Sequence, residues 1–183
     1  MSVPTSPDPS LLLLSVLYRA DSDDGALPCW TELEQLLQNQ FGPIRYRSPC
    51  MNFKQTQYYE PEMGSPLARH FLAFQELVSR ERLADIKLLT NEMERRFLNN
   101  KENRRINLDP GLLSLENLTL ATGKNFTHRI YLHSGIFAEV TLYYQKGYFQ
   151  LLPWTYPDYG SETVLEILTM LREQLRETLF PKK

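Results

Sequence analysis

The side chains best suited to binding or catalysis gather in one stretch of the chain, residues 104–144. Lys124, His128 and Arg129 place three potential cations within six residues. They lie next to the predicted end of a strand, where such a group can bind a phosphate or a carboxylate. The alternative is a hairpin connection whose charged side chains are solvated. The three residues are therefore a candidate anion site.

Two predicted strands of the same stretch add an acidic side chain and its neighbours. The alternation of "GIFAEVTLYY" places Glu139 and Thr141 on one face. In "HRIYL", Arg129 and Tyr131 lie on the face that carries polar groups, and the two faces can belong to one sheet surface. A glutamate in the middle of an apolar strand is costly unless it is paired. Glu139 is therefore either a cross-strand partner of Arg129 or part of a ligand-lined floor, with Glu139 or His128 as acid or base.

A further pair of polar side chains lies at the carboxyl end of a short predicted strand. Asn107 and Asp109 would point into a crevice there, although Asp109-Pro110-Gly111 is also a typical turn that ends a strand. Asp109 and Glu139 are candidates for acid–base chemistry. A carboxylate site for Mg²⁺ is conceivable, but the three histidines form no HxxxH pair and have no cysteine nearby. We therefore predict no metal site.

Aromatic and helical residues provide candidate walls for such a site. In the connector "PWTYPDYG", Trp154 and Tyr156 would form a flat aromatic wall. Alternatively, this connector packs across the sheet and orients the last helix. On a predicted helix that precedes the stretch, Lys87, Asn91 and Glu94 share one face. Such a face is usually solvated, but it supplies a second wall if it packs near the sheet edge.

Several well-marked functions are excluded or weakened by motif and charge. Gly123-Lys124 resembles part of a phosphate loop, but GxxxxGK[ST] requires glycine and a hydroxyl residue where the chain has Leu118 and Asn125. No GxSxG motif is present. The formal charge of −2 provides no field that attracts nucleic acid or an anionic membrane. The mixed-charge segment 95–105 leaves RNA binding as a third and weaker option.

The N-terminal apolar run and the two cysteines indicate a cytosolic protein. "LLLLSVL" is far shorter than the roughly 20 residues that span a bilayer, and we interpret it as a buried strand. Cys29 and Cys50 form no CxxC pair, so we expect reduced thiols.

The predicted elements alternate between strands and helices before an all-strand segment. Apolar periodicity predicts strands 11–19, 44–53, 69–78 and 105–108, helices 31–41 and 81–98, antiparallel strands 117–122, 128–132, 135–144 and 148–152, and a last helix capped by Ser161. The segment 69–78 is also compatible with a helix, and we favour a strand because Ser79 then caps the helix that follows. The first six elements match a ferredoxin-like βαββαβ layout, extended by the antiparallel meander and the terminal helix. The class is α+β. We expect residues 1–9 to be a disordered tail and residues 10–183 to form a single domain.

A series of segments resembles an uncharacterised bacterial family, known as a domain of unknown function. The segments, in order, are "YYEPEMG", "LADIKLLTNEMERRF", "RRINLDPGLLSLENLTLAT", "HRIYL", "GIFAEVTLYY" and "FQLLPWTYPDY". The resemblance covers nearly the whole chain and implies a small, single-domain cytosolic bacterial protein. Members of the family sometimes carry the label "GTP-binding protein". The resemblance supplies no catalytic residues.

These observations lead to two hypotheses of different kinds. The first is a cytoplasmic protein with a pocket for a polar, anionic small molecule that is nucleotide-like or phosphorylated. The second is a non-catalytic interaction or structural protein, in which the same polar residues serve pairing and turns. The residues identify no cofactor. They leave open whether the chain is an enzyme and which oligomeric state it adopts.

Overall fold

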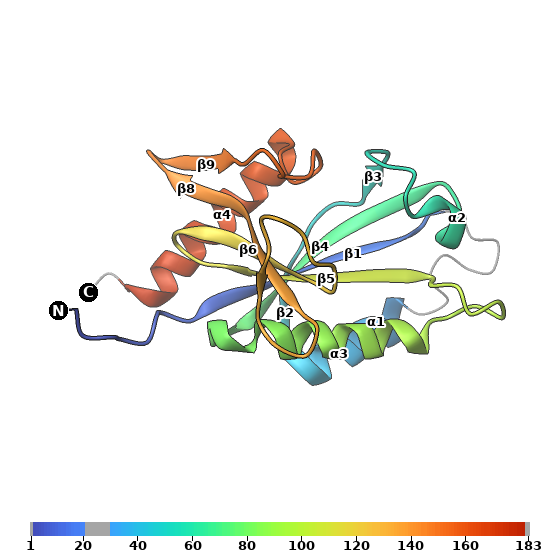
Figure 1. Ribbon diagram of the computed structural model, residues 1–183, viewed down its shortest axis with the longest axis horizontal. Helices are drawn as coiled ribbons and strands as arrows, with labels where there is room; N and C mark the ends of the chain where they lie inside the picture. The colour runs from blue at the N-terminus through green and yellow to red at the C-terminus, as the bar shows by residue number, and fades with distance from the viewer. Residues whose placement is uncertain (1, 21–29, 182–183) are drawn as a thin grey trace.

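All strands of the described structure belong to one antiparallel sheet. The computed structural model describes residues 2–20 and 30–181. Its nine strands are β1 (Ser10–Arg19), β2 (Ile44–Arg47), β3 (Met51–Phe53), β4 (Leu67–Val78), β5 (Ile106–Leu113), β6 (Asn117–Thr122), β7 (Ile130–Tyr131), β8 (Phe137–Gln145) and β9 (Tyr148–Leu151). The path across the sheet is β2-β4-β1-β5-β6-β8-β7, with β3 paired to β4 and β9 paired to β8 (Figure 1).

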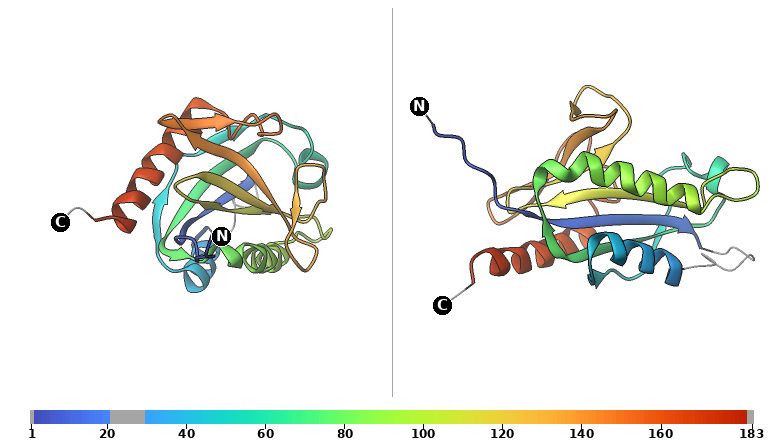
Figure 2. Two further views of the ribbon diagram at one scale, coloured as in Figure 1. Left: turned by 60° about the vertical axis from the view of Figure 1, so that its left-hand side comes forward. Right: turned by 90° about the horizontal axis from the view of Figure 1, so that it is seen from below.

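Helices cover both faces of this sheet. The described helices are α1 (Trp30–Phe41), α2 (Glu60–Met63), α3 (Leu83–Arg96) and α4 (Glu162–Leu179), with a 3-10 turn at Arg80–Arg82. The α1 and α3 helices pack on one face, and α4 packs on the other (Figure 2). The central strand β1 is apolar on both sides: Leu12 and Leu14 face α1 and α3, whereas Leu11 and Leu13 face α4. The continuous apolar run therefore forms the buried strand that was predicted.

The face that α4 covers becomes polar beyond the N-terminal end of this helix. Strand alternation continues the apolar rows of β4 and β5 into Arg69, Asn107 and Asp109. Asp109 pairs with Ser15 across the β1–β5 ladder. The sheet therefore provides a polar floor beside α4.

The sheet opens between β5 and β6, which pair only over Gly111–Leu113 and Leu118–Leu120. In the unpaired half of β5, the amide of Leu108 donates to Glu94 Oε1 (2.6 Å) and its carbonyl accepts from Lys87 Nζ (2.8 Å). Buried backbone groups need partners, and here two α3 side chains replace the missing strand. The predicted polar face of this helix is therefore packed against a sheet edge.

The turn predicted at Asp109-Pro110-Gly111 is wrong, because β5 continues through it to Leu113. Pro110 lies two residues after Leu108, so its nitrogen points toward the same open edge and no β1 ladder bond is lost. Gly111 lies at a close approach of the two strands: a Cβ atom there would lie 2.6 Å from Leu120 Cδ2 and 3.2 Å from the Thr119 carbonyl oxygen. This glycine lets β6 cross close to β5 where the two parts of the sheet join.

Comparison with the predicted elements confirms the α+β class and most element positions. The segment predicted as one strand over 44–53 is two strands, β2 and β3. The Ser48 hydroxyl, which lies between them, accepts the amide hydrogen of Phe71 on β4. The strand order β2-β4-β1-β5, with α1 and α3 on one face, is compatible with the ferredoxin-like layout, which stays a prediction. The expected tail and the single domain also stay predictions. No described helix is long and apolar enough to cross a membrane.

Candidate functional site

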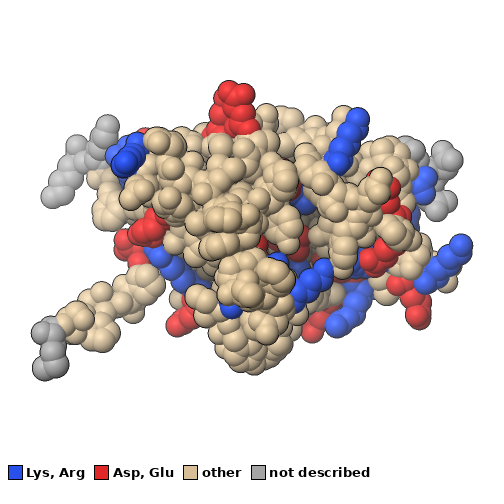
Figure 3. Space-filling view, turned by 45° about the horizontal axis from the view of Figure 1, so that its top comes forward, with Lys and Arg blue, Asp and Glu red and all other residues tan. Residues whose placement is uncertain are grey.

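A pocket of about 550 Å³ lies between the polar floor of β4 and β5 and the β6–β8 part of the sheet. This volume is in the range of small-molecule sites. Its charged lining residues are Arg69, Lys87, Arg104, Asp109, Lys124, Arg129, Glu139 and Asp158. Its aromatic lining residues are Phe53, Tyr58, Tyr59, Tyr156 and Tyr159. Charged side chains of both signs are interspersed on the face shown in Figure 3, whereas the pocket lining has five cations and three carboxylates.

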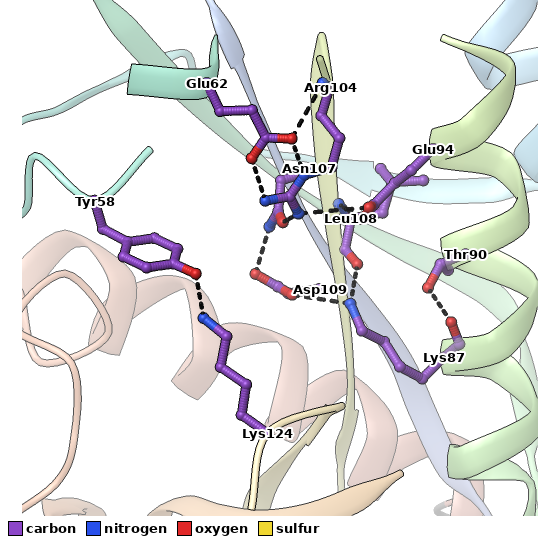
Figure 4. A network of polar contacts seen from close by, with 10 residues as sticks. All are labelled: Tyr58, Glu62, Lys87, Thr90, Glu94, Arg104, Asn107, Leu108, Asp109 and Lys124. Atoms are coloured by element: carbon purple, nitrogen blue, oxygen red, sulfur yellow. Dashed lines mark hydrogen bonds and ion pairs between the residues drawn. The ribbon is translucent and has the colours of Figure 1, made fainter. Parts of the chain in front are cut away.

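A chain of hydrogen bonds crosses the floor of the pocket (Figure 4). Arg104 makes a two-pronged contact with Glu62, from Nε (2.8 Å) and Nη2 (2.7 Å). Its Nη1 donates to Asn107 Oδ1 (2.7 Å), and Asn107 Nδ2 donates to Asp109 Oδ2 (2.7 Å). Lys87 Nζ donates to Asp109 Oδ1 at 3.1 Å. The chain fixes the orientation of the Asn107 amide and the Asp109 carboxylate.

The carboxylates of this region have shifted pKa values. Burial alone would raise the pKa of Asp109, but the Lys87 ammonium holds it below its ordinary value of 3.8. The hydrogen bond from Arg104 likewise lowers the pKa of Glu62. Burial raises the pKa of Glu94, although Lys87 opposes this shift. Asp109 is therefore an ionised acceptor and a weak base at neutral pH.

Arg69 is a buried cation on the same floor. Its side chain is 7% exposed and forms an ion pair with Asp158, which precedes α4. The guanidinium lies 4.5 Å from the ring centroid of Phe53, a distance typical of cation–π contact. Its Nε atom has no hydrogen-bond partner among the described residues. Arg69 is therefore a buried, ion-paired cation with one N–H donor that is not used by the described residues.

Two tyrosines hold the loop between β6 and β7 against neighbouring segments. Lys124 Nζ donates to Tyr58 Oη at 2.6 Å and lies 4.1 Å from the centroid of the same ring. Arg129 donates from Nη2 to Tyr156 Oη (3.3 Å) and from Nη1 to the Lys124 carbonyl (2.9 Å). Lys124 and Asp109 both line the pocket, and among the residues drawn in Figure 4 no hydrogen bond joins the Tyr58–Lys124 pair to Asp109.

Glu139 is the most enclosed acid of the site. Its side chain is 2% exposed and accepts from Arg129 Nε at 2.6 Å. His128 Nε2 lies 3.2 Å from the same carboxylate oxygen, and its ring stacks on Trp154 at 4.7 Å between centroids. Trp154 donates its indole N–H to the Val140 carbonyl (2.8 Å). This arrangement is the cross-strand pair that was one of the two interpretations of Glu139.

The structure brings most of the predicted site residues to one pocket. The predicted residues that line it are Asn107, Asp109, Lys124, Arg129, Glu139 and Tyr156. Three others lie outside the lining. His128 and Trp154 stack behind Glu139, and Tyr131 is 59% exposed and packs edge-on against Phe137.

Sequence reasoning did not select Arg69 or Arg104 as site residues. The tyrosines at positions 58, 59 and 159 were considered as parts of aromatic walls, from "YYEPEMG" and "PWTYPDYG", with packing as the alternative role, and they line the pocket. A signal for Arg69 exists, because it is a charge inside the apolar strand "LARHFLAF" and such a charge needs a partner. Arg104 lies in the mixed-charge segment 95–105, where charged side chains are expected to be solvated, so its sequence context did not mark it as a site residue. In the described ranges, no group of three or more His, Cys, Asp or Glu side chains could hold a metal ion.

The fold and the site define an α+β protein with a divided antiparallel sheet and a charged, aromatic-lined pocket at the division. Residues 8–175 match the family described as "Domain of unknown function (DUF4416)", and the chain belongs to this family. No curated protein and no solved structure was found to match the chain. The family description supplies no activity, so a function has to be argued from the pocket.

Proposed function

We propose that the protein binds a polar, anionic small molecule, nucleotide-like or phosphorylated, in the pocket formed by the strands of residues 104–144 and their neighbours. The protein would act in the cytoplasm, where the exposed thiol of Cys50 stays reduced. Whether binding leads to a reaction is a separate question, for which Asp109, Glu139 and His128 are the candidate acids and bases.

The observation that carries the proposal is a cation without a counter-ion. Four lining cations have carboxylate partners: Arg69 with Asp158, Lys87 with Asp109, Arg104 with Glu62, and Arg129 with Glu139. Among the described lining residues, Lys124 has a phenol and an aromatic ring as partners but no carboxylate. An ammonium group at the wall of a pocket attracts a phosphate or a carboxylate.

The test is a thermal-shift screen with nucleotides, sugar phosphates and their dephosphorylated counterparts. A ligand at a hundred times its Kd stabilises the native state by about 2.7 kcal/mol, which raises Tm by roughly 5–10 °C for a domain of this length. We expect phosphorylated compounds to give the larger shifts. Lys124→Met should reduce them, whereas Lys146→Met, at an exposed position of the β8–β9 turn, should not.

The alternative function is a non-catalytic interaction or structural protein. The sealed pair of Glu139 and Arg129 favours it, because these charges already satisfy each other. Phe126, Ile130 and Tyr131 are 61%, 70% and 59% exposed, and a protein partner that contacts the β6–β7 loop and β7 would cover apolar side chains there. A screen without any ligand response, together with co-purification of one protein partner, would support this alternative and contradict the anion-binding proposal.

A further inference from the structure

The two polar sides of the pocket offer a ligand opposite kinds of hydrogen bond. Lys124 carries three N–H donors and donates to the phenol of Tyr58, which leaves two donors for a ligand. Asp109 has about four acceptor positions and uses two of them, for Lys87 and Asn107. Figure 4 shows the Tyr58–Lys124 pair separated from Asp109 and its hydrogen-bonded partners.

The acceptor character of the Asp109 side is built into the hydrogen-bond chain. Arg104 occupies Asn107 Oδ1, so the Asn107 amide nitrogen must face Asp109. Glu62 in turn holds Arg104 through two hydrogen bonds. The Asp109 side chain keeps 28% of its exposure and lines the pocket. Its remaining acceptor positions are available to hydroxyl or amino hydrogens of a ligand.

The donor character of the Lys124 side is supported by the backbone of the β6–β7 loop. The Lys124 amide donates to the Thr122 hydroxyl (3.2 Å), and the Lys124 carbonyl accepts from Arg129 (2.9 Å). These bonds hold the backbone of Lys124 in place, while its ammonium group stays exposed. This end of the pocket therefore suits a group with several acceptor oxygens.

Extending the proposed anion binding, on which this inference rests, we propose a class and an orientation for the ligand. It is a phosphorylated polyhydroxy compound, a sugar phosphate or a nucleotide. Its phosphoryl oxygens accept from Lys124, and its hydroxyl or amino hydrogens are donated to Asp109. A compound with only one of the two features would use one side of the pocket and bind more weakly.

The experiment measures dissociation constants by calorimetry for AMP, adenosine, ribose 5-phosphate, ribose and inorganic phosphate. The proteins are the wild type, Lys124→Met, Asp109→Asn and the control Lys146→Met. We expect Lys124→Met to weaken the binding of AMP and ribose 5-phosphate by about tenfold or more, the usual effect of losing a charge-assisted hydrogen bond. The affinities for adenosine and ribose should not change. We expect Asp109→Asn to weaken the binding of adenosine and ribose, which carry no charge. It should not weaken the binding of inorganic phosphate, because the variant leaves the Lys87 ammonium without its carboxylate partner.

A measurement on the wild type covers the case in which Asp109→Asn does not fold. In amide NMR spectra of the labelled protein, inorganic phosphate should shift the signals of residues 123–125 and leave those of residues 107–109 in place. Adenosine should do the reverse, and AMP should shift both groups. Inorganic phosphate shifting both groups equally would contradict the orientation.

Two kinds of failure can be told apart. If none of the five compounds and no compound of the thermal screen binds, the proposed anion binding fails, and the ligand class fails with it. If compounds bind but the phosphorylated and dephosphorylated members of a pair bind equally well, the pocket does not recognise the phosphoryl group. The proposal that Lys124 binds this group is then wrong. If Lys124→Met and Asp109→Asn weaken every compound by the same factor, the two-sided assignment alone is overturned.

Discussion

Replacing Glu139 by glutamine leaves the guanidinium of Arg129 without its counter-ion inside the protein. The two side chains are 2% and 10% exposed, and Arg129 Nε lies 2.6 Å from the carboxylate. Removing one partner of a buried ion pair costs about 3–5 kcal/mol, because the remaining charge stays desolvated. Arg129 keeps its hydrogen bonds to the Lys124 carbonyl and to Tyr156, so we expect a loss near the lower end, about 3 kcal/mol.

Urea unfolding followed by circular dichroism measures this loss. The corresponding decrease in Tm is roughly 6–12 °C for a chain of this length. The double variant Glu139→Gln/Arg129→Met should recover part of the stability, because it leaves no uncompensated charge. A loss below about 1 kcal/mol, the size typical of exposed pairs, would refute the reasoning. The ion pair with Arg129 would then contribute little to stability, and the Glu139 carboxylate could exchange Arg129 for a ligand at low cost.

Three further substitutions test other parts of the structure by urea unfolding. Burial raises the pKa of Glu94 above its ordinary value of 4.5 despite the opposing Lys87 charge. This side chain therefore keeps its proton to a higher pH in the folded chain than in the unfolded chain, and its contribution to stability falls as pH rises above 4.5. Glu94→Gln should remove that fall, and an unchanged pH slope would contradict it. Gly111→Ala should cost about 1–3 kcal/mol, because its Cβ would lie 2.6 Å from Leu120 Cδ2 and 3.2 Å from the Thr119 carbonyl oxygen. A neutral effect would contradict this, because it would show that the Leu120 side chain moves aside without cost. Trp154→Phe should cost about 1 kcal/mol, because the indole hydrogen bond to a backbone carbonyl is lost, and an unchanged midpoint would disprove this role.

The parts of the site that were predicted follow from short-range periodicity. Alternation along the β7–β8 hairpin placed Arg129 and Glu139 on one surface, and they are bonded there. Helical spacing grouped Lys87, Asn91 and Glu94; Lys87 and Asn91 line the pocket, and Glu94 accepts from the Leu108 amide at the sheet edge. Both arguments need only the backbone repeat of one element or of two adjacent strands.

The parts that were not predicted depend on contacts between distant segments. Arg69 meets Asp158, and Arg104 meets Glu62, and no local pattern links these residues. The same limit applies to Pro110, which resembles a strand end when the chain is considered locally. Only the missing β6 neighbour, a property of the whole sheet, makes a proline acceptable at that position.

The narrow junction between β5 and β6 has a consequence for how a ligand in the pocket would change the unfolding of the protein. The segments before and after this junction share three residue pairs of ladder, yet both contribute walls to one pocket. A molecule bound to Asp109 on one segment and to Lys124 on the other would link the two segments non-covalently. Occupancy would then make the two segments melt together, and protease sensitivity of the β6–β7 loop would fall along with that of β5.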